Sequence, residues 1–238
     1  MTKAMILTIG LLSAGAISSA QTSADSYVMP KTSSPNFYLE AGPSYMNMKM
    51  TAKDGDTSVN GPKTFLGGTL AFGWRIAKEH KVQLEVGAYS SDSATLYSDS
   101  YANAGDGYNQ SVKLKATAIP LLASYSYCIA FAPGNQELRI SPAIGLMMMS
   151  AKLTDDYSET YQGTTYTDNE SKSASSTAFA VGVGAGYTYH FSPKFYLDGG
   201  LRYLRVAKTS YKFYPDEDAA KVNAMNSFTI SAAFGFKF

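Results

Sequence analysis

The chain has 238 residues, 45% of them hydrophobic, which suits one folded domain. Its formal net charge of +1 provides no strong positive field, and this argues against a nucleic-acid-binding role. The only cysteine, Cys128, excludes an intrachain disulfide and a cysteine-based metal site, and we expect no metal or other cofactor.

Residues 1–20 have the pattern of a secretory signal peptide. Lys3 supplies the positive charge, and residues 4–17 form an apolar stretch that is too short to span a bilayer as a helix. Small residues follow, so we expect cleavage after Ala20; the alternative is a short buried N-terminal helix. Residues 21–35 are polar, contain two prolines and predict a flexible lead.

Eight strand-like segments follow and define one domain at residues 36–238. They lie at 36–50, 63–76, 82–91, 110–129, 137–151, 176–191, 195–206 and 226–238. Many exceed the five or six residues usual for a soluble strand, and they suit tilted membrane strands of about nine to eleven residues with extensions. No stretch after the N-terminal segment approaches 18 consecutive apolar residues, so no membrane helix is expected.

Most segments alternate between a bulky apolar face and a small or polar face. In the sixth segment, the bulky face comprises Phe179, Val181, Val183, Ala185, Tyr187, Tyr189 and Phe191. The residues between them are mostly Gly and Ala, and small residues inside a narrow barrel leave room for long side chains from other strands. The fourth segment breaks this alternation at Pro120, which predicts a β-bulge that shifts the pattern by one residue.

Along the chain, short connections between the segments alternate with long ones. The long ones, at 51–62, 92–109, 152–175 and 207–225, are polar. This asymmetry is typical of outer-membrane barrels, whereas a lipocalin-like soluble barrel would not require it. The sequence therefore predicts an all-β fold, an eight-stranded antiparallel up-and-down transmembrane β-barrel with both termini at the short-turn end.

The last segment carries aromatic residues up to its final position. Phe234, Phe236 and Phe238 share its apolar face. This segment resembles the C-terminal strand, ending in Phe, that the assembly machinery of bacterial outer membranes reads. We therefore expect these three side chains to form an assembly signal.

Three further pieces resemble the outer-membrane β-barrel domain shared by OmpA-, OmpX- and OmpW-like proteins. They are residues 118–122 (AIPLL), 141–145 (SPAIG) and 199–203 (GGLRY), in that order along the chain. The resemblance covers about residues 36–238. It implies a protein of a Gram-negative outer membrane, but it implies little about activity because the family is functionally diverse.

Charged residues on the small face predict a network inside the barrel. Its members are Glu40, Arg75, Glu85, Arg139, Asp198 and Arg202, and Lys237 shares their face. Opposite charges in a water-poor lumen should pair. The network is either a gated ion path or, as we favour, a salt-bridge plug, because side chains just fill an eight-stranded barrel.

His190 and Ser192 raise the alternative of an enzyme. A lipid A deacylase of the outer membrane, also an eight-stranded barrel, uses a His-x-Ser pair, in which His would activate the Ser nucleophile. Here the pair abuts a short turn, which places it at the periplasmic rim, away from the lipid A leaflet. We therefore expect no catalytic residues.

The long connections at 92–109 and 152–175 contain tyrosines among small polar residues, a composition that suits adaptable recognition surfaces. The tyrosines are Tyr97, Tyr101, Tyr108, Tyr157, Tyr161 and Tyr166. Alternatively, they extend the strands as a solvated sheet above the membrane.

The expected function is non-enzymatic: an envelope-structural and surface-interaction role. The alternatives are a narrow porin-like channel for small or apolar solutes and a barrel that modifies lipid A. Expected partners are outer-membrane lipid and lipopolysaccharide, the barrel assembly machinery and a host or other surface ligand, with the protein itself a monomer.

Overall fold

The computed structural model describes residues 36–54, 57–103, 106–131, 135–213 and 219–238. The predicted signal peptide (1–20) and lead (21–35) lie outside these residues. Within the described ranges, no helix is long and apolar enough to cross a membrane.

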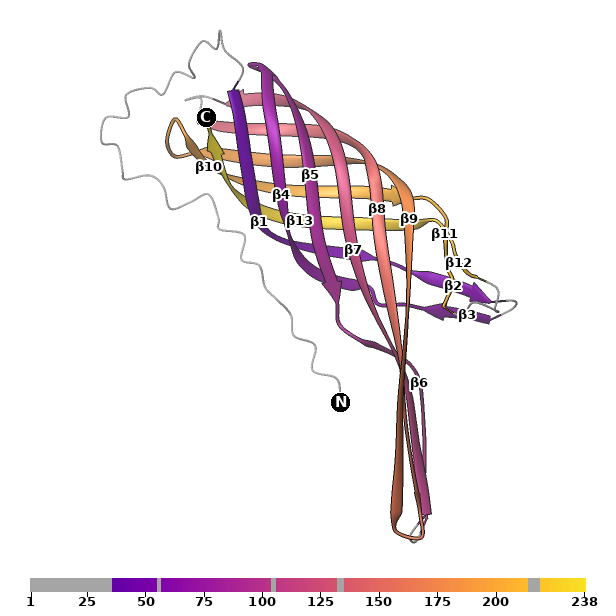
Figure 1. Cartoon of the computed structure of the whole chain (residues 1–238). Helices are drawn as coiled ribbons and strands as arrows, with labels where there is room; N and C mark the ends of the chain where they lie inside the picture. The colour runs from indigo at the N-terminus through magenta and orange to yellow at the C-terminus, as the bar shows by residue number, and fades with distance from the viewer. Residues whose placement is uncertain (1–35, 55–56, 104–105, 132–134, 214–218) are drawn as a thin grey trace.

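Eight antiparallel strands form a closed ring (Figure 1). They are β1 (Asn36–Met48), β4 (Thr64–Ala77), β5 (His80–Ser91), β7 (Asp106–Phe131), β8 (Gln136–Tyr161), β9 (Thr164–His190), β10 (Phe195–Val206) and β13 (Met225–Lys237). Neighbours pair in the order β5-β4-β1-β13-β10-β9-β8-β7, and pairing of β5 with β7 closes the ring. The predicted eight-stranded up-and-down barrel is confirmed.

The period of two in the sequence separates the two surfaces of the ring. Large apolar side chains lie exposed on its outer surface, among them Leu66, Phe72, Trp74, Leu84, Ile144 and Leu201. Small residues on the inner surface admit larger neighbours. A Cβ on Gly235 would lie 2.1 Å from Cζ of Tyr196, and one on Gly73 would lie 2.0 Å from Cζ of Tyr38, so both rings depend on glycine beside them.

The bulge predicted at Pro120 is wrong. The pairing of β7 with β8 keeps one register past Pro120, which lies opposite Met147. Ala116 and Ala118 are buried on the inner surface, whereas Leu121 lies exposed on the outer one, so no shift in parity is needed. The alternation was misread because the inner residues before Pro120, Leu114, Ala116 and Ala118, are apolar rather than polar.

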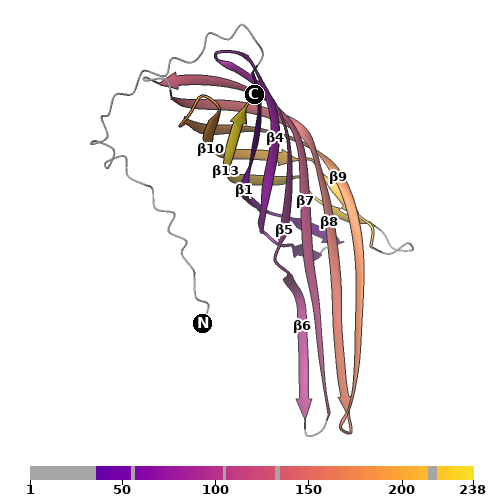
Figure 2. The ribbon, with the colours of Figure 1, turned by 60° about the vertical axis from the view of Figure 1, so that its left-hand side comes forward.

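Three ring strands continue far beyond the barrel and build an arm (Figures 1 and 2). β7, β8 and β9 have 26, 26 and 27 residues, and β6 (Ala94–Asn103) pairs with the distal part of β7. The order in the arm is β6-β7-β8-β9. The connections expected at 92–109 and 152–175 are therefore mostly sheet, as the second interpretation of the tyrosines predicted.

A second, smaller sheet lies at the same end of the barrel. Its strands are β11 (Thr209–Tyr211), β12 (Ala220–Val222), β2 (Thr51–Asp54) and β3 (Thr57–Asn60), paired in that order. They come from the connections expected at 51–62 and 207–225. In Figure 1 this sheet and the arm leave the barrel in different directions.

A methionine-rich apolar layer fills the lumen at the arm end. Six buried methionines belong to it, with exposed fractions of at most 6%: Met46, Met48, Met50, Met147, Met149 and Met225. β1 and β8, which carry four of them, are four strands apart in either direction around the ring, so their side chains approach from opposite walls. Flexible methionine side chains fill such irregular space well.

Candidate functional site

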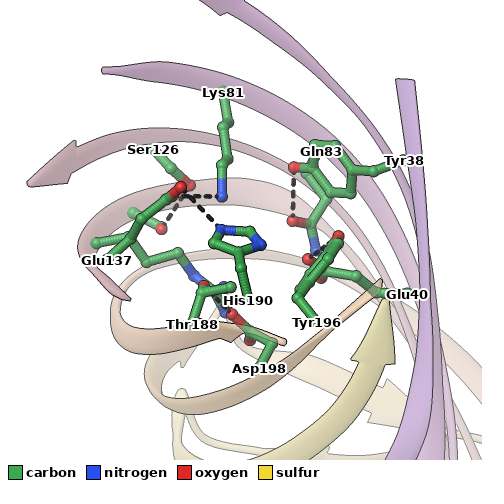
Figure 3. Close-up of polar contacts among 12 residues, drawn as sticks. Tyr38, Glu40, Lys81, Gln83, Ser126, Glu137, Thr188, His190, Tyr196 and Asp198 are labelled. Carbon is green, nitrogen blue, oxygen red and sulfur yellow. Dashed lines mark hydrogen bonds and ion pairs between the residues drawn. The ribbon is translucent and has the colours of Figure 1, made fainter. Parts of the chain in front are cut away.

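The lumen near the short turns is organised around Glu137, which is only 1% exposed. Arg75 Nη2 lies 2.6 Å from Oε1 of Glu137, and Lys81 Nζ lies 2.9 Å from Oε2. His190 Nε2 lies 3.0 Å from Oε1 (Figure 3). These residues occupy inward positions at the ends of β4, β5, β8 and β9, so one carboxylate joins four strands.

A second set of polar contacts lies around Asp198 and Glu85. Arg139 forms an ion pair with Asp198, which also accepts a hydrogen bond from Thr188 Oγ1 at 2.6 Å. Arg202 binds Glu85 through both terminal nitrogens, with Nη2 at 2.8 Å from Oε2.

Glu40, the remaining carboxylate of the expected network, has an uncharged partner. It accepts a hydrogen bond from the hydroxyl of Tyr196 at 2.9 Å (Figure 3). The structure thus places all six expected network residues on the lumen side, but it joins Arg75 to Glu137 rather than to another member. Sequence reasoning missed Glu137 and Lys81, although each shares strand parity with charged or polar residues of the inner face.

The space left between these charges is small. A polar cavity of about 30 Å³ lies among Glu40, Glu85, Arg139, Asp198 and Arg202. That volume holds about two water molecules. The methionine layer lies between this cavity and the arm end, so the interior consists of a charged layer followed by an apolar one.

We expect no steady conductance when the purified protein is reconstituted into planar bilayers, because both layers fill the lumen. The Arg202→Ala variant should also stay closed, since the methionine layer remains. Reproducible channels of the unaltered protein would contradict a filled lumen. Opening by Arg202→Ala alone would show that the charged layer is the barrier and that the methionine layer is not.

His190 and Ser192 are engaged elsewhere. His190 contacts Glu137, while Ser192 Oγ accepts hydrogen bonds from the backbone N–H groups of Lys194 at 3.3 Å and Phe195 at 2.9 Å. Within the described part of the chain, the two side chains share no hydrogen bond with each other. The geometry is that of a hydrogen-bonded histidine near a serine that stabilises a turn.

The terminal phenylalanines lie in an aromatic cluster on the outer surface at the short-turn end. The ring of Phe236 lies 5.1 Å from that of Phe195 and 6.1 Å from that of Phe238, measured between centroids. Phe234 lies 5.5 Å from Phe195, and Phe238 is 62% exposed. A row of this kind suits the interface of a bilayer.

The six tyrosines singled out in the sequence all lie on the arm, and all lie on one face of it. In the ladders of β6 to β9, directly opposite residues share a face, and the register brings together Tyr97, Tyr101, Tyr108, Tyr157, Tyr161 and Tyr166. This face continues the inner surface of the barrel, because it has the parity of buried Ala116, Ala151 and Ala174.

Comparison with known proteins identifies a family. The family described as "Outer membrane protein beta-barrel domain" matches residues 9–238. The chain is similar to the crystal structure of Neisserial surface protein A, with 18% identity, 85% of this chain and 97% of that chain covered, and a TM-score of 0.42. No curated protein matches the chain.

Two other solved structures are also similar. Ail of Yersinia pestis has 14% identity over 84% of this chain and 98% of its own, with a TM-score of 0.40. A major outer membrane protein from Thermus thermophilus has 14% identity over 86% of this chain and 100% of its own, with a TM-score of 0.46.

Proposed function

The chain belongs to the outer membrane protein beta-barrel domain family, and from this premise we propose that it is a non-enzymatic barrel whose arm presents a binding surface outside the cell. In barrels of bacterial outer membranes, short turns face the periplasm and long connections face the exterior. The same orientation puts the Glu137 cluster at the periplasmic end and the arm outside. The N-terminal signal-peptide pattern supports export with cleavage after Ala20.

The observation that carries this proposal is the arm itself. It is a paired four-stranded sheet rather than a set of loose loops, and it gathers six tyrosines on one face. Tyrosine supplies large contact area with two side-chain torsions to order, so it binds at low entropic cost. A paired sheet that displays such side chains away from the membrane is suited to contact with other surfaces.

Both alternatives find less support. A channel for small or apolar solutes needs an open path, whereas two layers of side chains fill the lumen. A lipid A-modifying enzyme needs a nucleophile within hydrogen-bond reach of its base. Among the described residues, Ser192 Oγ accepts hydrogen bonds from the backbone of its turn and shares none with His190.

Removal of the arm tests the proposed function. Replacing residues 97–112 and 155–170 with short Gly-Ser connectors cuts the arm along one row of paired residues, because Tyr97 lies opposite Val112 and Asp155 opposite Glu170. The barrel should still fold, as a mobility shift between unheated and boiled samples reports. Cells carrying this variant should lose binding to host matrix, mucus components or neighbouring bacteria.

The matched control inserts one Gly-Ser pair between Gln162 and Gly163, the positive-φ residues at the tip of the β8–β9 hairpin, and leaves both faces intact. This control should bind as the parent does. If the arm-deleted barrel folds and every binding and envelope-integrity assay is unchanged, a purely structural barrel becomes the better account.

A further inference from the structure

The two faces of the arm differ sharply in chemistry. From Asp155 to the tip, one face combines the six tyrosines with six carboxylates, Asp99, Asp106, Asp155, Glu159, Asp168 and Glu170. We call it the tyrosine–carboxylate face. The other face carries small polar or small residues and one acid: Ser98, Ser100, Ala102, Gly107, Asn109, Ser111, Asp156, Ser158, Thr160, Thr165, Thr167 and Asn169.

The charge of this region has one sign. The segments 97–103, 106–112, 155–161 and 164–170 contain seven acidic residues and no lysine or arginine. Lysines begin only nearer the barrel, where Lys172 pairs with Glu170 at 2.6 Å and Lys113 with Asp156 at 2.8 Å. The distal face is therefore strongly negative.

Tyrosines and carboxylates alternate across the strands. The directly opposite pairs include Tyr108–Glu159, Tyr157–Asp168 and Tyr166–Glu159. Side chains in such pairs start about 5 Å apart, so one cationic group can reach a ring and a carboxylate together. This arrangement differs from a plain acidic cluster, because aromatic rings separate the charges.

Hydrogen bonds hold several of these groups in place. Asp99 accepts from the hydroxyls of Tyr108 at 2.5 Å and Tyr97 at 3.2 Å, and Glu159 accepts from that of Tyr157 at 3.0 Å. The bond from Tyr108 lowers the pKa of Asp99 and raises the pKa of Tyr108, so the carboxylate stays ionised and the phenol stays neutral at neutral pH. Tyr161 and Tyr166 are 57% and 65% exposed.

We propose that the tyrosine–carboxylate face binds an extended polypeptide segment rich in arginine and lysine. This inference rests on the proposed surface-binding function and names the partner's chemistry. Carboxylates supply ion pairs, and tyrosine rings attract the same cations through their π faces. The negative field repels anionic partners such as acidic polysaccharides.

The spacing of the face favours a polypeptide. Tyr166 and Asp168 lie two residues apart on β9, a separation of about 7 Å along a strand, and offer a ring and a carboxylate to successive cations. Alternate side chains of an extended peptide have the same spacing, so a segment lying along the arm presents its cations in register. The opposite face has the same backbone spacing, but it carries no tyrosine and one acidic residue, Asp156.

The test measures binding of a fluorescent (Arg-Ser)6 peptide to the full mature barrel in phosphatidylcholine nanodiscs, whose lipid adds no net charge. A (Glu-Ser)6 peptide is the opposite-charge probe. We expect saturable binding of the arginine peptide, weaker binding as NaCl rises, and none of the glutamate peptide. Equal binding of both peptides, or of neither, would overturn the proposal.

Exchanging residues between the two faces of the arm tests whether peptide binding depends on the position of the carboxylates or only on the net charge. The variant Ser158→Glu/Glu159→Ser/Thr167→Asp/Asp168→Thr moves two carboxylates to the opposite face while keeping composition and charge. We expect about five- to tenfold weaker binding of the arginine peptide, since two ion pairs on the face are lost. Unchanged affinity would show that net charge alone attracts the peptide, and the proposal would fall.

Tyrosine variants provide a second measurement if the exchange variant folds poorly. Tyr161→Ser/Tyr166→Ser should weaken binding by about fivefold, whereas Tyr161→Phe/Tyr166→Phe should retain most of it because the rings remain. If the serine and phenylalanine double variants bound the arginine peptide with equal affinity, the aromatic rings would contribute nothing to binding, and the proposal would be overturned.

The outcomes distinguish this inference from the proposed function. If arm deletion abolishes binding of whole cells while the exchange variant binds the arginine peptide like the parent, the surface function stands and the cationic partner is wrong. If arm deletion leaves whole-cell binding unchanged while the peptide results are as expected, the chemistry of the face stands and the proposed function fails.

Discussion

Changing Glu137 to Gln should lower the free energy of unfolding by about 3–5 kcal/mol, the usual cost of removing one partner from a buried ion pair. Glu137 is the acceptor for Arg75, Lys81 and His190, and it is 1% exposed. Without its charge, two buried cations lose their counter-ion. Urea titration of the barrel folded in lipid vesicles measures the loss.

The matched control is Asp156→Asn on the arm. Asp156 pairs with Lys113 at 2.8 Å, but the two side chains are 36% and 44% exposed, so this change should cost at most about 1 kcal/mol. High salt should reduce the effect at Asp156 and leave most of the effect at Glu137. Similar losses for both variants would mean that the Glu137 cluster is open to water.

Lys81→Met added to Glu137→Gln should recover part of the lost stability, because it removes one of the uncompensated cations. The two sites are in contact, so their effects should not add. An additive double variant would show that Lys81 and Glu137 do not interact in the folded barrel.

Changing Phe238 to Ser should cause a severe loss of barrel from the outer membrane while changing intrinsic stability by no more than about 1–2 kcal/mol. The ring is 62% exposed on the outer surface and stacks on Phe236 and Phe37, so little packing is lost. The larger effect should come from the missing assembly signal. Quantifying barrel in outer membranes and, separately, urea stability after refolding gives both numbers.

Phe228→Ser is the control for position. Phe228 lies on the same face of the same strand and is 42% exposed, but it is distant from the C-terminus. It should cost a similar amount of stability without the assembly defect. Equal amounts of the Phe238 and Phe228 variants in outer membranes would remove the assembly-signal interpretation.

The barrel was predictable from the sequence because one side of each strand meets apolar surroundings. In β9 and β13 the bulky residues recur at every second position, and this pattern fixes both strand and face. The arm was harder to predict because water surrounds it, so neither face is apolar. Its signal was a different alternation, Tyr157, Glu159 and Tyr161 on one side and Ser158 and Thr160 on the other.

The contents of the lumen were only partly predictable. Strand parity identified which charged side chains point inward, but it cannot say which of them meet across the barrel. The pairing of Arg75 with Glu137, which was not among the expected network residues, therefore could not be predicted. The methionine layer was missed because Met147 and Met149 alternate with apolar neighbours that face outward. Where both faces of a strand carry apolar residues, the sequence no longer alternates between apolar and polar, and the inward face cannot be recognised.

The unbroken register of β7, β8 and β9 limits how the length of the arm can change. A single residue inserted into β8 between Ala151 and Asp155 would turn Tyr157, Glu159 and Tyr161 to the opposite side, because a strand reverses its faces with each residue. Insertions of two residues in each paired strand would keep the faces and lengthen the arm by about 7 Å. Natural or engineered relatives with this surface should therefore differ in arm length by even numbers of residues per strand.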